Sequence, residues 1–455
     1  MKKLFAIIAL CALHFALFAP AAHAELKVDI VAGNVEPVPI AIQKFETPTP
    51  ASKSDLSPGA LAKGDTIARD AETMRGVVEN DLKSSGLFRI IAHDAFPEVA
   101  AFDAMPKFND WAMINAQVLV QTKIEPADGD KYSLSFYVWD INGKEQIEAQ
   151  TLVSTKKSMR RIAHIMADAI YERLTGEVGY FDTQIIFIAE SGPVDARVKR
   201  LAIMDSDGYG FRYMSDGDTM VMSPHFSPNM QTVLFLSYRD PDPTVWALDM
   251  NTGAQHRLGK FGGMTFAPRF SPDGTRVAMS LVDADAVNLY EYDIAAKTMR
   301  RLTDGGINTS PSYSPDGTRM AYNSNASGSQ QLHILDLKTM TSTRLSYGDG
   351  RYATPAFSPD GNYIAFTRIT ADTFYIGIMD PDGKHEKILA SGWFMESPSW
   401  APNSRRVVYY ETDRASDTDR TSHIRSVDII GQNNYEIKLP AGVNGTEPTW
   451  SPKLP

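Results

Sequence analysis

The sequence predicts a two-domain protein, in which an N-terminal α/β (α+β) domain precedes a six-bladed β-propeller closed by its own C-terminal strand. Three observations predict this fold. A seven-residue phrase recurs six times in the second half of the chain, at intervals of 43 to 50 residues. Helix and strand patterns succeed one another before the first copy. The strands left over at the two ends of the repeat array complement each other, as a closed ring requires.

The repeated phrase reads Pro-x-aromatic-Ser-Pro-Asp-Gly, with variations, and marks one blade. In the copy from Pro311, Ser314-Pro315-Asp316-Gly317 has type I turn chemistry, because proline presets φ at the second position and glycine suits the fourth. One strand pattern precedes this turn and three follow it, which gives the four antiparallel strands of a blade. The copies are PHFSPNM from Pro224, PRFSPDG from Pro268, PSYSPDG from Pro311, PAFSPDG from Pro355, PSWAPNS from Pro398 and PTWSPKL from Pro448.

The third position of the phrase is always aromatic, and we expect these rings to pack between neighbouring blades rather than to bind a ligand. The aromatic residues are Phe226, Phe270, Tyr313, Phe357, Trp400 and Trp450.

The ends of the array indicate how the propeller closes. Strand patterns at 184–190, 199–205 and 211–215 precede the first phrase, whereas the chain ends soon after the last phrase. Three strands at the start and one at the end together make a sixth blade, and this removes the open sheet edges. We therefore predict a propeller over residues 182–455.

Residues 1–24 have the features of an export signal. Lys2 and Lys3 precede an apolar run, and Ala22-His23-Ala24 has the form of a cleavage site, so we expect the mature chain to begin at Glu25. Cys11, the only cysteine, falls within this segment, and its surroundings do not favour a lipoprotein. The sequence predicts an exported protein without disulfides, most simply in a bacterial periplasm, with no direct membrane insertion.

The net charge argues against two classes of function. Without residues 1–24, which contain two lysines and no acidic residue, the formal net charge changes from −10 to −12. This balance argues against general binding of nucleic acid or of an anionic membrane.

Residues 25–178 are expected to form the α/β domain, with residues 177–182 as a linker. Residues 25–36 alternate apolar and polar side chains, which is typical of an edge strand or of a detachable segment that adds to a partner's sheet. The remaining elements are predicted as strands at 38–45, 88–92, 116–124, 132–139 and 146–154 and helices at 65–84, 108–113 and 158–174.

The search for catalytic or metal-binding motifs finds only near misses, so no catalytic residue, metal or cofactor is predicted. Gly59 to Gly64 has P-loop spacing in an expected loop, but Asp65-Thr66 follows where Lys-Ser/Thr is needed. Asp205-Ser206-Asp207-Gly208 and the run Asp380–Gly383 resemble the opening of a calcium loop, yet hairpin turns explain both. The aspartates of the phrases lie one per blade, too far apart for paired acid–base chemistry.

A closed propeller presents one concave mouth lined by a loop from every blade, and variable loops on a rigid ring are where a binding site belongs. The loops that lead into the phrases carry Met264, Phe266, Asn308, Thr309, Tyr352, Trp393, Phe394, Glu396, Asn444 and Glu447.

Three stretches point to a particular family. They are LKVDI at 26–30, VVENDLKSSGLFRII at 77–91 and AHIMADAIYERLTGEVGYFDTQIIFIAES at 163–191. Together with the export signal and the six phrases, they make the chain resemble the TolB family of the Tol-Pal envelope system over almost its whole length. Two copies depart from the repeat, with Asn229-Met230 in the first and Lys453 in the last, which weakens turns and leaves the resemblance intact.

The resemblance implies a non-enzymatic, monomeric periplasmic protein that supports outer-membrane integrity and invagination during cell division. It implies that the mature N-terminal segment, with Glu25, Leu26, Val28 and Ile30, binds the inner-membrane protein TolA. It further implies that the channel face binds the peptidoglycan-associated lipoprotein Pal, for which the expected residues are Met264, Phe266, Ala267, Asn308, Thr309, Ser310, Tyr352, Thr354, Glu396 and Glu447.

The alternative is a periplasmic propeller enzyme, either a peptidase or a polysaccharide lyase. A peptidase would need a hydrolase domain, but the sequence has no G-x-S-x-G nucleophile elbow. A lyase would need histidines and carboxylates in the channel, for which His225 and His333 are the candidates.

Overall fold

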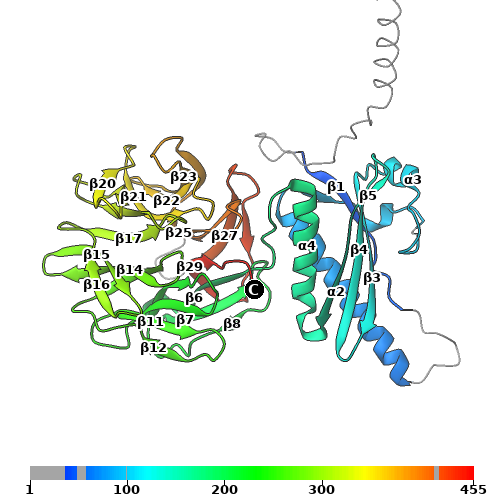
Figure 1. The fold of residues 1–455 in the computed structure, drawn as a ribbon, viewed down its shortest axis with the longest axis horizontal. Helices are drawn as coiled ribbons and strands as arrows, with labels where there is room; N and C mark the ends of the chain where they lie inside the picture. Colours follow the sequence, from blue (N-terminus) through cyan, green and yellow to red (C-terminus); the bar gives the residue numbers. More distant parts are fainter. Residues whose placement is uncertain (1–35, 49–57, 99, 415–419, 455) are drawn as a thin grey trace, which may run out of the picture.

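Two domains lie side by side in the computed structural model, an α/β domain and a six-bladed propeller (Figure 1). The structure describes residues 36–48, 58–98, 100–414 and 420–454. The expected export signal, 1–24, and residues 25–35 of the expected TolA-binding segment 25–36 lie outside this range. Among the described helices, none combines the length and the hydrophobicity that a membrane crossing needs.

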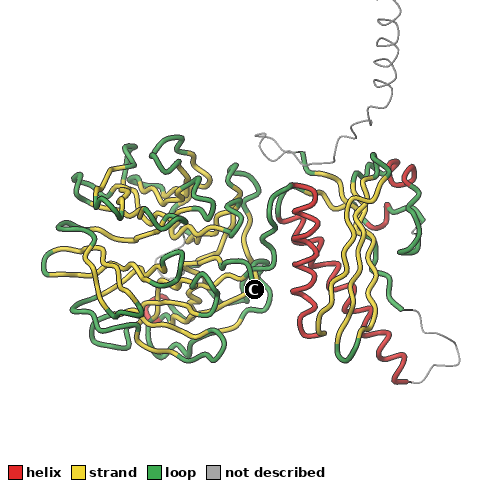
Figure 2. Tube along the Cα trace, viewed as in Figure 1, coloured by secondary structure: helices red, strands yellow, loops and turns green. Residues whose placement is uncertain are grey.

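The α/β domain is a mixed five-stranded sheet in the order β2-β1-β3-β4-β5, with β1 parallel to both of its neighbours. Helices α2 and α4 cover the face turned towards the propeller, and α3 lies on the other side (Figures 1 and 2). The elements are β1 Val38–Ile42, α2 Pro58–Ser84, β2 Phe88–Ile90, η2 His93–Ala95, α3 Phe108–Met113, β3 Val118–Ala127, β4 Lys131–Asp140, β5 Glu145–Thr155, η3 Lys156–Ser158 and α4 Met159–Thr175.

Both main helices follow from their sequence patterns, although one begins earlier than predicted. In α4, Ile162, Met166 and Ile170 are buried on one face, and Gly176 ends the helix with φ of 77° and a backbone bond to Glu172. Helix α2 begins at Pro58 rather than at residue 65, because Pro suits the first helical position and Ala, Leu and Lys are good helix formers. The P-loop-like spacing at 59–64 is therefore helix, and the expected loop there was wrong.

The propeller has six four-stranded antiparallel blades, as predicted. The first three are β9 Val221–Phe226, β10 Thr232–Ser237, β11 Thr244–Asp249, β12 Gln255–Arg257; β13 Thr265–Phe270, β14 Arg276–Asp283, β15 Ala286–Asp293, β16 Thr298–Arg301; and β17 Asn308–Tyr313, β18 Arg319–Ser324, β19 Gln331–Asp336, β20 Thr341–Arg344. The fourth and fifth are β21 Arg351–Phe357, β22 Ile364–Ile369, β23 Phe374–Met379, β24 Lys387–Gly392; and β25 Phe394–Trp400, β26 Arg406–Thr412, β27 Ser422–Asp428, β28 Tyr435–Ile437.

The sixth blade joins the two ends of the propeller. Its strands are β29 Asn444–Trp450, β6 Gln184–Ser191, β7 Val198–Asp205 and β8 Arg212–Tyr213, with η4 Val194–Ala196 between β6 and β7. The C-terminal β29 pairs antiparallel with β6, from Asn444 opposite Glu190 to Trp450 opposite Ile185. The closing strand predicted from the sequence is thus confirmed.

The aromatic residue of each phrase is buried at a boundary between blades, as predicted. Trp400 of the fifth blade donates its indole N–H to the carbonyl of Ala356 in the fourth, at 2.9 Å. Tyr313 of the third blade donates its hydroxyl to Glu291 of the second, also at 2.9 Å. These rings therefore fix the relative positions of neighbouring blades.

The two domains share one packed core. Tyr171 of α4, Tyr180 and Phe181 of the linker and Trp450 of β29 are buried together. Two ion pairs between the domains flank this core. Arg160 of α4 pairs with Asp207 of the propeller, and Lys453 pairs with Asp168 of α4 at 3.2 Å.

Asp316→Ala is expected to lower the free energy of unfolding by about 1 kcal/mol. The Asp316 carboxylate accepts bonds from the Ser314 hydroxyl, at 2.5 Å, and from the backbone N–H of Thr318, at 3.0 Å. These bonds lower its pKa from 3.8 to about 2, so its contribution is present above pH 3.8 and is lost as the pH falls through 2. Urea denaturation at pH 7 and pH 2.5 measures both effects.

The control for this prediction is Asp285→Ala, which removes an exposed aspartate from another turn of the propeller. A loss of stability that is equal for the two variants, or that does not shrink at low pH, would contradict the role assigned to Asp316.

Candidate binding site in the propeller channel

Six residues with left-handed backbone conformation form a ring around the channel, which we call the bulge ring. Each stands directly before the first proline of a phrase and has φ between 46° and 57°. In every blade the pairing of the first two strands shifts register here, which marks a β-bulge. Proline cannot donate to a ladder, so a bulge on an edge strand accommodates it. The ring consists of Ser223, Ala267, Ser310, Thr354, Ser397 and Glu447.

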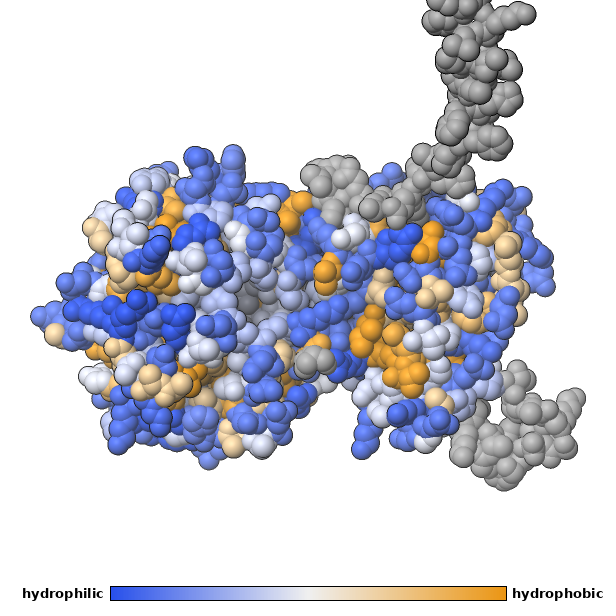
Figure 3. Space-filling view, viewed as in Figure 1, coloured by the Kyte–Doolittle hydropathy of each residue, from blue (hydrophilic) through white to orange (hydrophobic). Residues whose placement is uncertain are grey.

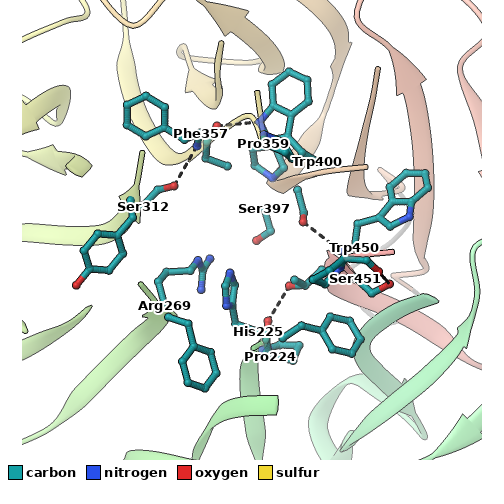
Figure 4. A pocket seen from close by; sticks show the side chains of 18 of the residues that line it. Pro224, His225, Arg269, Ser312, Phe357, Pro359, Ser397, Trp400, Trp450 and Ser451 are labelled. Atoms are coloured by element: carbon teal, nitrogen blue, oxygen red, sulfur yellow. Dashed lines mark hydrogen bonds between the residues drawn. The ribbon is translucent and has the colours of Figure 1, made fainter. Parts of the chain in front are cut away.

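The bulge ring and the phrases that follow it line a cavity of about 400 Å³ at the centre of the propeller (Figure 4). The second residue of each phrase also lines it, and these six residues are His225, Arg269, Ser312, Ala356, Ser399 and Thr449.

Three of these second-position residues hold neighbouring inner strands together. The Ser312 hydroxyl accepts the backbone N–H of Phe357 at 3.0 Å, and the Ser399 hydroxyl accepts that of Trp450 at 3.1 Å. The Thr449 hydroxyl donates to a backbone carbonyl of the first blade at 2.7 Å. The wall is therefore fixed before any partner arrives, which lowers the entropic cost of binding.

Two carboxylates lie on the side of the fifth and sixth blades. Glu447 accepts the backbone N–H of Ser223 at 2.7 Å and the Ser223 hydroxyl at 3.2 Å. Glu396 accepts the hydroxyl of Tyr410 at 3.2 Å. Burial raises the pKa of both carboxyls, and in Glu396 the proximity of Glu447 raises it further.

Two basic side chains lie on the next two blades around the ring, the first and the second. His225 and Arg269 point into the channel beside each other (Figure 4). Burial, together with the neighbouring Arg269 charge, holds the pKa of His225 well below its ordinary value, so the imidazole is neutral at pH 7. Burial also lowers the pKa of Arg269, to about 10, and the guanidinium remains charged.

The structure places the predicted Pal-binding residues in three positions. Ala267, Ser310, Thr354 and Glu447 belong to the bulge ring and line the cavity. Met264 is exposed, 40% of its surface being accessible, and Phe266 and Glu396 are half-buried. Asn308, Thr309 and Tyr352 bond within the wall, as described next.

Asn308 and Tyr352 are buried, with 3% and 0% of their surfaces exposed. Asn308 donates to the carbonyl of Gly305 at 2.8 Å, and Tyr352 donates to Glu386 at 2.8 Å. Thr309 is half-buried and accepts the Asn323 amide at 2.6 Å. Contact of these residues with a partner stays a prediction, and their present bonds stabilise the loops of the wall.

The sequence-based selection missed Arg269, Ser223 and Ser397, all of which line the cavity. It considered His225 only for a lyase. The sequence did contain a signal for the two basic residues. At the second position of the phrase, four copies have Ser, Ala or Thr, and only His225 and Arg269 are basic.

The acidic motifs considered for calcium form turns, as expected. Gly208 and Gly383 have φ of 90° and 82°, and their N–H groups bond to the carbonyls of Asp205 and Asp380 at 2.9 Å. The possible ligand atoms of His164, Asp205 and Asp207 lie within 4.8 Å of one another, close enough to hold a metal ion. However, the guanidinium of Arg160 pairs with both aspartates, so part of their negative charge is already compensated.

Comparisons with known proteins agree with this architecture. A family model for the TolB amino-terminal domain matches residues 26–147, and the model for the TolB beta propeller domain matches residues 171–454. The chain is 39% identical over 435 residues to the "Tol-Pal system protein TolB" of Gluconobacter oxydans (strain 621H), and this alignment covers 95% of the chain and 89% of that protein. The crystal structure of TolB from Acinetobacter baumannii has a TM-score of 0.77 and 23% identity, and the superposition covers 94% of this chain and 100% of that one.

Fold and channel define a two-domain β-propeller protein with an α/β domain at its N-terminal side. Within this class, the two family models and the Gluconobacter relative identify the particular family. The chain belongs to the TolB family of the Tol-Pal system.

Proposed function

We propose that this protein is a non-enzymatic periplasmic scaffold that binds Pal in the propeller channel and TolA through residues 25–36. In this role it supports outer-membrane integrity and invagination during cell division. Membership of the TolB family supports the assignment to the Tol-Pal system. The observation that carries the channel part of the proposal is the bulge ring, which sets six rigid loops around one cavity.

The chemistry of the channel suits a protein loop. Its wall combines prolines, small hydroxyl residues and both acidic and basic side chains, and hydrophilic residues cover most of the visible propeller face (Figure 3). Such a polar, preformed concave surface favours a partner that offers hydrogen-bonding groups in a defined arrangement.

The channel gives little support to the enzyme alternative. His333, one of the two histidines considered for a lyase, lies on β19, the third strand of its blade, and is buried away from the cavity lining. The channel thus has one histidine, neutral and beside Arg269, among the described residues that line it.

Ala356→Trp is expected to weaken Pal binding by at least about 100-fold, because an indole at the second position of the fourth phrase would fill much of the cavity. Isothermal titration calorimetry of the full mature chain with the soluble domain of Pal measures the dissociation constant. Ala296→Trp, in an exposed turn of the second blade, is the matched control and should bind as the unsubstituted chain does.

Two outcomes would overturn the proposed site. The unsubstituted chain could fail to bind Pal, or Ala356→Trp could bind as tightly as the control while its thermal unfolding is normal.

The TolA part of the proposal has its own test. Deletion of residues 25–36 should abolish binding of the TolA C-terminal domain, and retained binding would contradict this part.

A further inference from the structure

We propose that Arg269 is a specificity-determining residue of the channel, which binds an aspartate or glutamate side chain of the docking loop of the protein partner. This inference rests on the proposed function and adds the chemistry that the partner must present. It is carried by the position of Arg269, by its bonding and by the charges around it.

Arg269 occupies a position that other blades use differently. Three of the six second-position residues, on the third, fifth and sixth blades, bond through their hydroxyls to a neighbouring inner strand. The Arg269 guanidinium instead points into the cavity, where its Nη1 donates to the carbonyl of Pro268 at 2.9 Å. The side chain therefore leaves most of its five N–H donors directed at the channel.

Within the described part of the chain, Arg269 forms no ion pair with a carboxylate. The Glu447 charge acts on Arg269 from a longer distance, but Ser223 already binds that carboxylate. A half-buried guanidinium without a paired counter-charge is unfavourable, whereas a carboxylate can meet it with two parallel hydrogen bonds. An incoming carboxylate would thus compensate a charge that the free protein leaves uncompensated.

His225 strengthens this site. It lies beside Arg269, and its buried Nδ1 has no hydrogen-bond partner among the described residues. Burial is the main cause of the low pKa of His225 and repulsion by Arg269 adds to it, so a carboxylate held by Arg269 would offset the repulsion and raise the pKa of His225. Binding is then coupled to partial uptake of a proton.

The charges also orient the partner. Glu447 lines the cavity on the sixth blade, next to the first, and Arg269 lines it on the second blade, so an acidic side chain is favoured at Arg269 over a position beside Glu447. Hydroxyl, amide or backbone N–H donors of the same loop would face Glu447. The polarity of the channel thereby selects one orientation of the docking loop.

The test compares Arg269→Gln and Arg269→Lys with Arg301→Gln in calorimetric titrations with the soluble domain of Pal. Arg301 is the matched control, because it lies on β16, the outermost strand of the same blade, and pairs with Asp304. We expect Arg269→Gln to weaken binding by about 30-fold or more. We expect Arg269→Lys to be intermediate, since lysine keeps the charge without the bidentate geometry, and Arg301→Gln to be unchanged.

Two further readouts identify the carboxylate. Neutralising each acidic residue of Pal in turn should reveal one whose loss weakens binding to the unsubstituted chain but not to Arg269→Gln. Titrations at pH 7 in two buffers of different ionisation enthalpy should show proton uptake that His225→Gln abolishes.

The outcomes separate the inference from the proposed function. If the unsubstituted chain binds Pal and Arg269→Gln binds equally well, the inference is overturned and the Pal site stands. The inference also fails if no acidic residue of Pal is coupled to Arg269. If the unsubstituted chain does not bind Pal, both are overturned.

Discussion

Trp450→Ala is expected to lower the free energy of unfolding of the propeller by about 3–5 kcal/mol. Trp450 is 4% exposed, donates its indole N–H to Thr183 at 2.8 Å and packs edge-on against Tyr180, with ring centroids 5.9 Å apart. It stands at the end of the closing strand, so its removal leaves a cavity where the last blade, the linker and α4 meet. Denaturation monitored by circular dichroism measures the loss, and deletion of residues 444–455 should abolish the cooperative transition.

Trp393→Ala is the matched control for this prediction. It removes the same side chain from a half-buried position between β24 and β25, where a loss below about 1 kcal/mol is expected. Equal losses for the two tryptophans, or a cooperative transition in the truncated chain, would contradict closure of the ring by β29.

Asp81→Asn is expected to lower the free energy of unfolding by about 3 kcal/mol at pH 6.5. Asp81 of α2 and His164 of α4 form a buried pair at 2.6 Å, with side chains 2% and 4% exposed. Burial disfavours the charged imidazole, but the Asp81 carboxylate outweighs this effect and raises the pKa of His164 to about 9. The substitution would leave that imidazole without its counter-charge.

The pH dependence of this loss has a definite sign. Because the pKa of His164 rises on folding from 6.5 to about 9, its contribution is present below pH 6.5 and is lost as the pH rises through 9, and because burial raises the pKa of Asp81 to about 6, both partners are charged between about pH 6 and pH 9. The difference between the unsubstituted chain and Asp81→Asn should therefore shrink between pH 6.5 and pH 9. Asp70→Asn, on the same helix and half-buried, is the control, and a difference independent of pH would contradict the assignment.

The propeller could be predicted from the sequence because each blade repeats the same local chemistry. Four neighbouring residues determine the turn that begins at Ser314, and the hydrogen bonds that Asp316 accepts are those expected for such a turn. The closing strand followed from counting strands, since an unpaired β6 would have left an open edge. The start of α2 was missed because residues 58–64 lack the apolar spacing on which the prediction relied.

The direction of the channel side chains could not be predicted in the same way. Side chains alternate between the two faces of a regular strand, but each inner strand contains a bulge before its proline, and an inserted residue reverses the alternation. Asn308 and Tyr352 stand before the bulge and turn into the wall, whereas Arg269 stands after it and points into the cavity. A loop position alone therefore did not distinguish residues that face a partner from residues that hold the loop.

The pairing of β6 with β29 also has a mechanical consequence. The chain enters the propeller from the α/β domain at β6, and this strand is bonded along its length to β29 on one side and to β7 on the other. Tension between a protein anchored in the channel and one attached to the α/β domain would pull β6 lengthwise, so that many hydrogen bonds share the force at once. A sheet loaded in shear resists rupture far better than one whose hydrogen bonds break one at a time. The pairing of β6 with β29 and β7 would therefore resist such tension.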